Sequence, residues 1–86
     1  MISNLFKVLS DDTRIKILKI IAAEQEVCGC MLLEKLNINQ STLSHHMKLL
    51  VENELVNVRK DWKWSHYSIN KETIKQLCQV LKKEFM

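Results

Sequence analysis

The chain has 86 residues, a net charge of +3, and a composition that is 47% hydrophobic and 27% charged. Its length nearly excludes an enzyme with its own cofactor-binding fold, and its composition excludes a disordered chain. One Gly and no Pro exclude an all-β sandwich or barrel, which needs many tight turns. We therefore expect one mostly helical domain over residues 1–86, small enough to need a second subunit for stability.

The N-terminal sequence and the cysteines indicate the compartment. Residues 1–7 lack the charged and long apolar regions of a signal peptide, and no apolar run exceeds four residues. Three cysteines, an odd number, do not form a closed disulfide framework and are better interpreted as ligands, reactive thiols or core residues. We expect a cytoplasmic protein with no membrane partner.

The first two predicted elements are helices. The first has the i, i+3, i+4, i+7 spacing of a short amphipathic helix that ends near Ser10. Its apolar row is Ile2, Leu5, Phe6 and Leu9. Ser10, Asp11 and Asp12 predict the start of the second, with a hydroxyl cap and two carboxylates at the positive end of the helix dipole. Its predicted buried stripe is Ile15, Leu18, Ile21 and Ala22.

The next two predicted helices form a helix-turn-helix. One begins around Cys28 and ends at the break over residues 37–39, and Asn39 caps the other. Two short helices separated by about three residues are typical of this motif. The apolar residues of the first are Leu32, Leu33 and Leu36, and the row of the second is Leu43, His46, Met47 and Leu50.

A hairpin and a last helix complete the chain. Residues 55–59 and 64–69 are β-branched or aromatic in rough alternation, and the polar residues 60–63 separate them. Asn70 then caps a helix whose apolar row is Ile74, Leu77, Cys78, Leu81 and Phe85. The expected fold is mainly α with a small β-hairpin, in the order α-α-α-α-β-β-α of a winged helix-turn-helix.

The fourth helix has a polar face without a carboxylate, which suits a phosphate-lined groove. In a winged helix the second helix of the pair enters the major groove, and the hairpin reaches the neighbouring backbone. A merely solvated helix face more often mixes both charge signs, whereas the polar side chains here can contact bases or phosphates. The candidate DNA-binding residues are Gln40, Ser41, Thr42, Ser44, His45 and Lys48 of the helix and Arg59, Lys60 and Lys63 of the hairpin.

The histidines and tryptophans have simpler predicted roles. His45 and His46 point about 100° apart on a helix and cannot chelate one metal together. We expect His46 to be packed, His45 to contact a base or phosphate, and His66 to be structural. Trp64 is predicted to lie in the core, and Trp62 is open between core and stacking edge.

Cys28 and Cys30 form the second candidate site. At the first turn of a helix, backbone N–H groups and the helix dipole favour the thiolate that soft metals and metalloids require. Zinc prefers four ligands, and no Cys-x-x-Cys partner is present. From the residues alone, a metal site and a pair of core cysteines both stay open, and Cys78 is predicted to be core.

Four stretches of the chain together resemble the ArsR/SmtB family of winged-helix repressors that sense metals. The stretches are Leu9–Leu18, Glu26–Cys30, Gln40–Leu50 and Arg59–Tyr67. In the arsenic-sensing branch of that family, a Cys-x-Cys at the start of the third helix binds trivalent arsenic or antimony. The resemblance therefore implies that Cys28 and Cys30 are metal ligands.

The chain departs from the family pattern at three places. Many arsenic sensors have a third cysteine where this chain has Leu33, so the third helix cannot supply three thiolates. Residues 70–86 contain no His, so the zinc site that some members carry on the last helix is not expected. Trp62 stands where the family often has Gly at the tip of the hairpin.

The sequence thus predicts a transcriptional repressor, not an enzyme, that binds a pseudo-palindromic operator. We expect As(III), Sb(III) or another thiophilic ion at Cys28 and Cys30 to release it, with no cofactor required for DNA binding and no protein substrate. A thiol redox sensor and a winged-helix regulator without a metal inducer are the alternatives. A homodimer is expected through apolar residues of the first and last helices, namely Leu5, Phe6, Ile74, Leu77 and Leu81.

Overall fold

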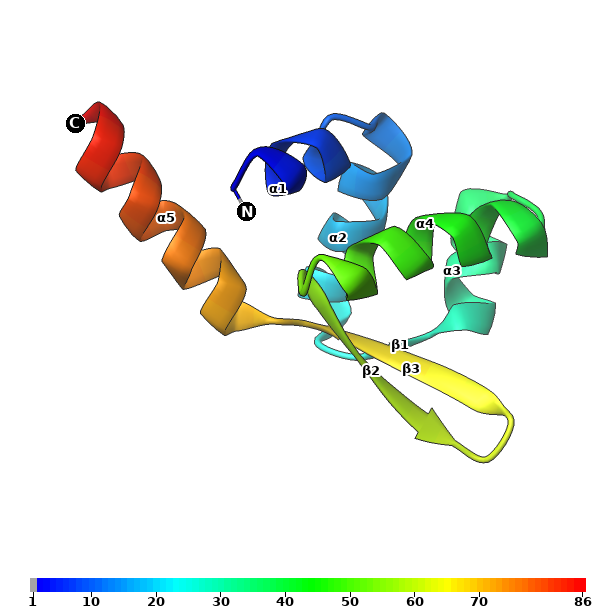
Figure 1. Cartoon of the computed structure of the whole chain (residues 1–86). Helices are drawn as coiled ribbons and strands as arrows, with labels where there is room; N and C mark the ends of the chain where they lie inside the picture. The colour runs from blue at the N-terminus through cyan, green and yellow to red at the C-terminus, as the bar shows by residue number, and fades with distance from the viewer. Residues whose placement is uncertain (1) are drawn as a thin grey trace.

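The computed structural model describes residues 2–86, with side chains from Ser3 onward, so the predicted apolar role of Ile2 lies outside the described part. The elements lie in a body of 42 × 22 × 21 Å (Figure 1). In chain order they are α1 (Ile2–Leu9), α2 (Asp12–Glu24), β1 (Val27–Cys28), α3 (Gly29–Leu36), α4 (Gln40–Glu52), β2 (Val56–Asp61), β3 (Trp64–Ile69) and α5 (Lys71–Phe85). The predicted helix-turn-helix and hairpin are both present.

The hydrophobic core is built by the first four helices and the base of the sheet. Its centre includes the fully buried Ile17, Leu32 and Leu50 of α2, α3 and α4. Among the described residues, the buried cluster consists of Val8, Ile17, Ile21, Val27, Leu32, Leu43, Met47, Leu50, Leu55 and Val56. The apolar row of α4 therefore packs into the core, and the opposite face of that helix is exposed to solvent.

Three of the helices begin at a residue whose side-chain oxygen accepts a backbone N–H. Asn39 accepts from Thr42 N at 2.8 Å, and Asn70 accepts from Thr73 N at 3.4 Å, as predicted. Asp11, not Ser10, caps α2 by accepting from Arg14 N. Ser10 instead donates to the Lys7 carbonyl at 2.6 Å, because it directly follows the last turn of α1.

The predicted buried stripe of α2 is partly wrong. Ile17 and Ile21 are fully buried one turn apart, whereas Ile15 and Leu18 are only half-buried and Ala22 is exposed. The helix carries apolar residues on a broad face, so the spacing alone did not decide which of two overlapping rows would point inward. Contacts with β1 and β3 on one side and α1 on the other select the row of Ile17.

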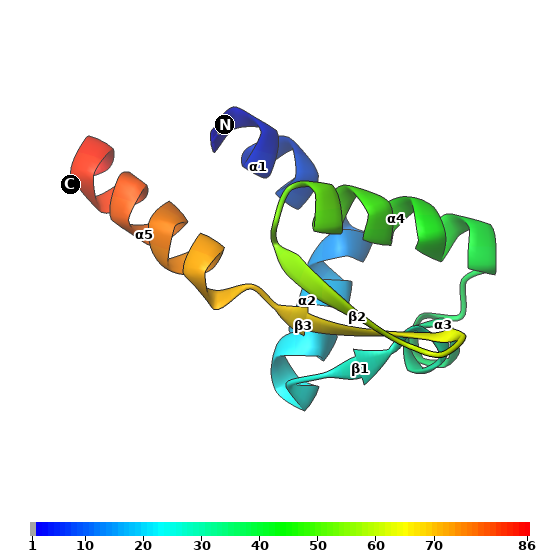
Figure 2. The same ribbon diagram turned by 60° about the horizontal axis from the view of Figure 1, so that its bottom comes forward.

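The sheet has three antiparallel strands in the order β1-β3-β2, one more than predicted. The short strand β1 pairs with β3 at Val27–Tyr67 and Cys28–His66. Two residues give no alternation that a sequence pattern could reveal, and only the neighbouring strand makes them a strand. This pairing attaches the start of α3 to the hairpin (Figure 2).

The hairpin is longer and its turn tighter than predicted. The strands pair out to Asp61 and Trp64, so only Trp62 and Lys63 form the turn. Trp62 has φ 62°, a conformation that favours Gly. The prediction that Trp64 is a core residue is wrong, because the hairpin has left the body at this point and exposes 48% of Trp64 and 90% of Trp62.

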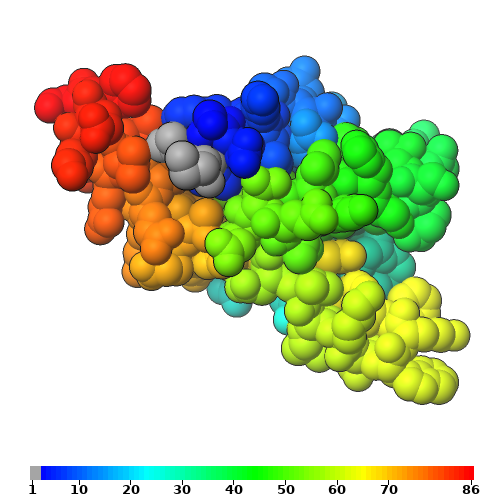
Figure 3. All heavy atoms as spheres, in the orientation of Figure 1, coloured from blue at the N-terminus to red at the C-terminus, as the bar shows by residue number. Residues whose placement is uncertain are grey.

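The space-filling view in Figure 3 shows the hairpin projecting from one end of the molecule and α5 from the other. Helix α5 has no buried residue over its 15 residues. Within residues 2–86, no helix combines the length and apolar character needed to cross a membrane.

Candidate nucleic-acid interface and thiol pair

The outer face of α4 is polar and open. All six predicted contact residues of this helix are exposed, while Leu43, His46, Met47 and Leu50 on the other side are buried. Gln40 Nε2 donates to Ser44 Oγ at 3.2 Å, which orders two of these side chains one turn apart. The six are Gln40, Ser41, Thr42, Ser44, His45 and Lys48.

His46 fixes α4 to the N-terminal helices, as predicted for a packed histidine. Its Nδ1 lies 3.3 Å from Arg14 Nη1, and Arg14 Nε donates to the Val8 carbonyl at 2.7 Å. Burial lowers the pKa of His46 below 6.5, with the nearby Arg14 guanidinium acting in the same direction and Asp11 opposing it. The neutral imidazole accepts from Arg14, so the polar face of α4 is held at a set angle to the body. Sequence reasoning did not pair Arg14 with His46.

The hairpin carries the three basic residues predicted to contact DNA, and all are exposed. Arg59 forms an ion pair with Glu26, with Nη2 to Oε1 at 2.8 Å and Nε to Oε2 at 3.3 Å. Asp61 lies 3.9 Å from the same guanidinium. The hydrogen bond from Arg59 lowers the pKa of Glu26. Glu26 was missed by sequence reasoning, because 33 residues separate the pair and only the β1–β3–β2 pairing brings them together.

The other two cations lie nearer the hairpin tip. Lys60 Nζ donates to Ser65 Oγ at 2.9 Å across the ladder. Lys63 Nζ is 5.7 Å from the ring centroid of Trp62 and 5.5 Å from that of Trp64. The tip therefore combines one positive charge with two exposed indoles.

Cys28 and Cys30 lie together at the first turn of α3. Cys28 occupies the N-cap, where its Sγ accepts from Cys30 N at 3.3 Å. A hydrogen bond between the two side chains lowers the pKa of Cys28 and raises that of Cys30. Cys28 is half-buried and Cys30 is exposed, so neither is a core cysteine. The prediction that Cys78 is a core residue is also wrong, since it is exposed on α5.

Within the described part of the chain, the two thiols have no third protein ligand beside them. Among the described residues, no group of three or more Cys, His, Asp or Glu side chains is placed to hold one ion. Cys78 belongs to α5, which lies on the opposite side of the molecule from α3 (Figures 1 and 2). His66 is the cross-strand neighbour of Cys28.

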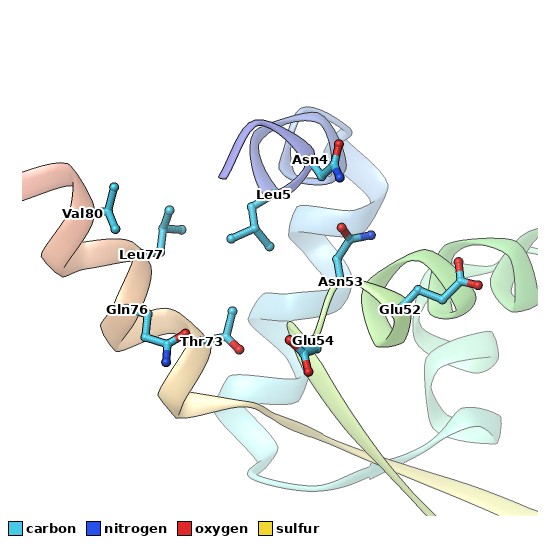
Figure 4. A pocket seen from close by; sticks show the side chains of 9 residues that line it. All are labelled: Asn4, Leu5, Glu52, Asn53, Glu54, Thr73, Gln76, Leu77 and Val80. Carbon is cyan, nitrogen blue, oxygen red and sulfur yellow. The ribbon is translucent and has the colours of Figure 1, made fainter. Parts of the chain in front are cut away.

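The predicted dimer residues lie on two helices that flank a cleft. Leu5 of α1 and Leu77 and Val80 of α5 face one another across it, above Glu54 and Asn53 (Figure 4). The cleft has a volume of about 380 Å³. Phe6 of α1 is 44% exposed, and Ile74, Leu77 and Leu81 of α5 are half-buried.

Comparison with known proteins places the chain in a family. Residues 11–58, from the cap of α2 into β2, match the family described as "Bacterial regulatory protein, arsR family". The arsenical resistance operon repressor of Staphylococcus aureus is 44% identical over 80 residues, which cover 93% of this chain and 76% of the repressor.

The chain belongs to the arsR family of bacterial regulatory proteins.

Two further likenesses extend this result. The CadC homolog of S. aureus, a cadmium resistance transcriptional regulatory protein, is 37% identical over 78 residues. The match covers 91% of this chain and 64% of the CadC homolog. A Mycobacterium bovis structure described as a homodimeric winged helix-turn-helix DNA-binding domain has a TM-score of 0.77 and 24% identity, covering 99% of this chain and 81% of that one. This arsR-family chain is thus a winged-helix transcriptional regulator and not an enzyme.

Proposed function

We propose that this chain is a homodimeric repressor that binds a pseudo-palindromic operator and leaves it when Cys28 and Cys30 capture As(III), Sb(III) or another thiophilic ion. The observation that carries the proposal is the position of the thiol pair. It caps α3, the first helix of the helix-turn-helix whose second helix presents the polar face. The names of the arsenical and cadmium resistance relatives support the same assignment.

The exposed face of α4 supports binding in the major groove. Gln40 can pair with adenine, Ser44 and His45 can contact bases or phosphates, and Lys48 can neutralise a phosphate. On the hairpin, Lys60 and Lys63 extend the cationic surface. Arg59 would bind a phosphate by giving up its ion pair with Glu26. Because phosphates release counterions when cations bind them, affinity should fall steeply as salt rises.

The thiol pair has the chemistry that a soft metalloid needs. The lowered pKa of Cys28 favours its thiolate, which is the form that binds metals. Exposure of Cys30 gives an ion access from solvent. Two thiolates from one turn of helix hold two of the three positions of As(III).

The short connection between α3 and α4 links capture to release. Only residues 37–39 separate the helices, and Leu32 and Leu43 belong to one buried cluster. An ion that shifts the first turn of α3 therefore displaces α4. A coupling of about 1–3 kcal/mol, equivalent to about 5- to 150-fold in DNA affinity, is enough to relieve repression.

A pseudo-palindromic operator has two half-sites related by a two-fold axis, so one protomer binds each half-site. The uncovered apolar side chains of α1 and α5 support an isologous interface formed by Leu5, Phe6, Ile74, Leu77 and Leu81. The M. bovis structure with the same fold is described as homodimeric, which supports a dimer here without specifying its interface. Light scattering at micromolar concentration should give the mass of two protomers, and the mass of one would refute the dimer.

DNA recognition is tested by selecting duplexes from a random pool and measuring their affinity by fluorescence anisotropy. Replacing Ser44 and His45 together by Ala should flatten sequence preference, because these residues face base edges. Arg59→Ala should weaken all sequences alike, because it meets the backbone. Equal binding of the unmodified protein to every duplex would refute sequence-specific repression.

Metalloid response is tested on the selected duplex under reducing conditions. Cys28→Ser and Cys30→Ser should each leave DNA binding intact and abolish release by arsenite, while Cys78→Ser should change little. Equal loss of response in Cys78→Ser would mean that the site spans two helices. Release by peroxide but not by arsenite would identify a thiol redox sensor instead.

A further inference from the structure

A small pocket opens beside Cys30, between α3, α4 and the hairpin. Its volume is about 190 Å³, room for about six water molecules at their share of liquid volume. The lining includes Cys30 and Leu33 of α3, Gln40 and Ser44 of α4, and Lys63 and Trp64 of the hairpin. None of the described residues that line it is acidic, and Lys63 is the basic one.

We propose that this pocket holds a low-molecular-weight thiol bearing a carboxylate, which supplies the third sulfur to As(III) on Cys28 and Cys30. This inference rests on the proposed function. As(III) prefers three sulfur ligands, and no third ligating side chain joins the pair within residues 2–86. The pocket adjoins the exposed Cys30, and its size fits a molecule like cysteine.

The chemistry is ligand exchange without any change of oxidation state. Arsenous acid, As(OH)₃, reacts with the thiols of Cys28, Cys30 and the small molecule. Three As–O bonds break and three As–S bonds form. Each thiol proton leaves with a hydroxide as water, so three waters are released and no oxidant or reductant is consumed.

The pocket wall explains the preference for a carboxylate. Lys63 lines the pocket, and none of the described lining residues carries a carboxylate that would compete for its ammonium group. The Trp64 ring and Leu33 cover the carbon chain of the thiol. Because the side chains at Lys63 and Trp64 are solvent-exposed, the charge contributes only a few-fold to affinity, and the As–S bond contributes the rest.

The same pocket couples the inducer to DNA release. Gln40, Ser44 and Lys63 line it and also belong to the surface proposed to contact DNA. A thiol bound there occupies side chains that DNA needs, so thiol-bound arsenic and DNA exclude one another. By reciprocity, a DNA duplex must weaken the arsenic complex by the same factor.

The first experiment measures arsenic binding without DNA. The two tryptophans of the chain both lie at the hairpin tip, so selectively excited tryptophan fluorescence reports on this region. Dialysed protein in a phosphine reductant is titrated with arsenite, with and without 3-mercaptopropionate. At a thiol concentration ten times its own Kd, apparent arsenite affinity should rise about tenfold. Native mass spectrometry should show one arsenic and one thiol per protomer.

The second experiment replaces the small thiol by a protein thiol. Leu33 lines the pocket one turn after Cys30, so Leu33→Cys should fill the third position and abolish the need for added thiol. Leu36→Cys is the matched control on the same helix, outside the pocket lining, and should keep the requirement. Equal effects of both variants would overturn the assignment to this pocket.

Phenylarsine oxide separates failure of this inference from failure of the proposed function. Its arsenic carries one phenyl group and needs only two thiols, so it should bind Cys28 and Cys30 and release DNA without any added thiol. If it does not bind, the proposed metalloid function fails. If it binds and arsenite affinity is indifferent to 3-mercaptopropionate, only the thiol pocket is refuted.

The carboxylate class is tested at Lys63. The unmodified protein should favour 3-mercaptopropionate over 2-mercaptoethanol by about two- to fivefold, which is the range of an exposed ion pair. Lys63→Gln should equalise the two thiols, whereas Lys19→Gln, which removes an exposed charge from α2, should not. A preference that survives Lys63→Gln would overturn the role of Lys63.

Discussion

Helices α4 and α5 share the same pattern of cap and apolar spacing, but α4 is packed into the core and α5 is not. Each begins at an Asn cap and carries an apolar row at helical spacing. Four residues of α4 are buried over 13, whereas α5 buries none over 15. An apolar row is covered by the same protomer in one case and left open in the other. The difference separates a helix whose apolar row holds the fold together from one whose row is open to the proposed dimer contact.

Leu77→Glu tests the open apolar row of α5, and we expect it to have the largest effect of the substitutions considered. In the proposed dimer the substitution buries an unpaired charge in an apolar interface, which leaves monomers or unfolded chains. Sedimentation velocity should show loss of the dimer at micromolar concentration. Lys75→Glu, at an exposed position of the same helix, is the control and should stay dimeric. A dimeric Leu77→Glu variant would place the interface elsewhere.

Leu50→Ala tests the buried apolar row of α4. Leu50 is fully buried, so the substitution should lower the free energy of unfolding by about 2–5 kcal/mol through lost transfer energy and a cavity. Urea unfolding should show the loss at every protein concentration. For Leu77→Ala, the loss should instead depend on protein concentration, because that half-buried side chain is fully covered only in the proposed dimer. Concentration-independent losses in both variants would remove the distinction between the two helices.

Removing the N-cap side chain of α4 or of α5 should lower the free energy of unfolding by a smaller amount, in the same way for both helices. Asn39→Ala should cost about 1 kcal/mol of stability, since it removes the acceptor of the Thr42 N–H group. Asn70→Ala should cost less, because its bond to Thr73 N is longer, 3.4 Å against 2.8 Å. Urea unfolding of the two variants side by side checks the order. Restoration by Asp at each position should identify capping as the cause.

Acidification should produce the smallest change. The folded-state pKa of His46 lies below 6.5, so the unfolded chain binds more protons between the folded value and 6.5. The free energy of unfolding should therefore fall as pH drops below 6.5. Asp11, whose pKa is lowered by the Arg14 N–H bond, adds a loss at more acidic pH. His46→Gln should flatten the first part of the profile, as measured by urea unfolding at a series of pH values.

Much of the candidate site followed from local pattern. The polar face of α4 was predictable because helical periodicity assigns Leu43, Met47 and Leu50 to one side and leaves the other side polar. Arg59 was predicted to contact DNA, and the structure adds that it is paired with Glu26, a partner that the sequence pattern did not reveal. That contact depends on strand β1, whose two residues carry no periodic signal.

The sequence by itself determined the helix boundaries near Asn39 and Asn70, the apolar row of α4, the hairpin and the Cys28–Cys30 pair, because each depends on residues within a few positions of one another. Tertiary structure alone decided that Ile17 points inward, that Trp64 stays outside, and that Arg14 meets His46. It also placed the pocket where Cys30, Ser44 and Lys63 converge. Such contacts join residues far apart in the chain, and packing, not local periodicity, selects them.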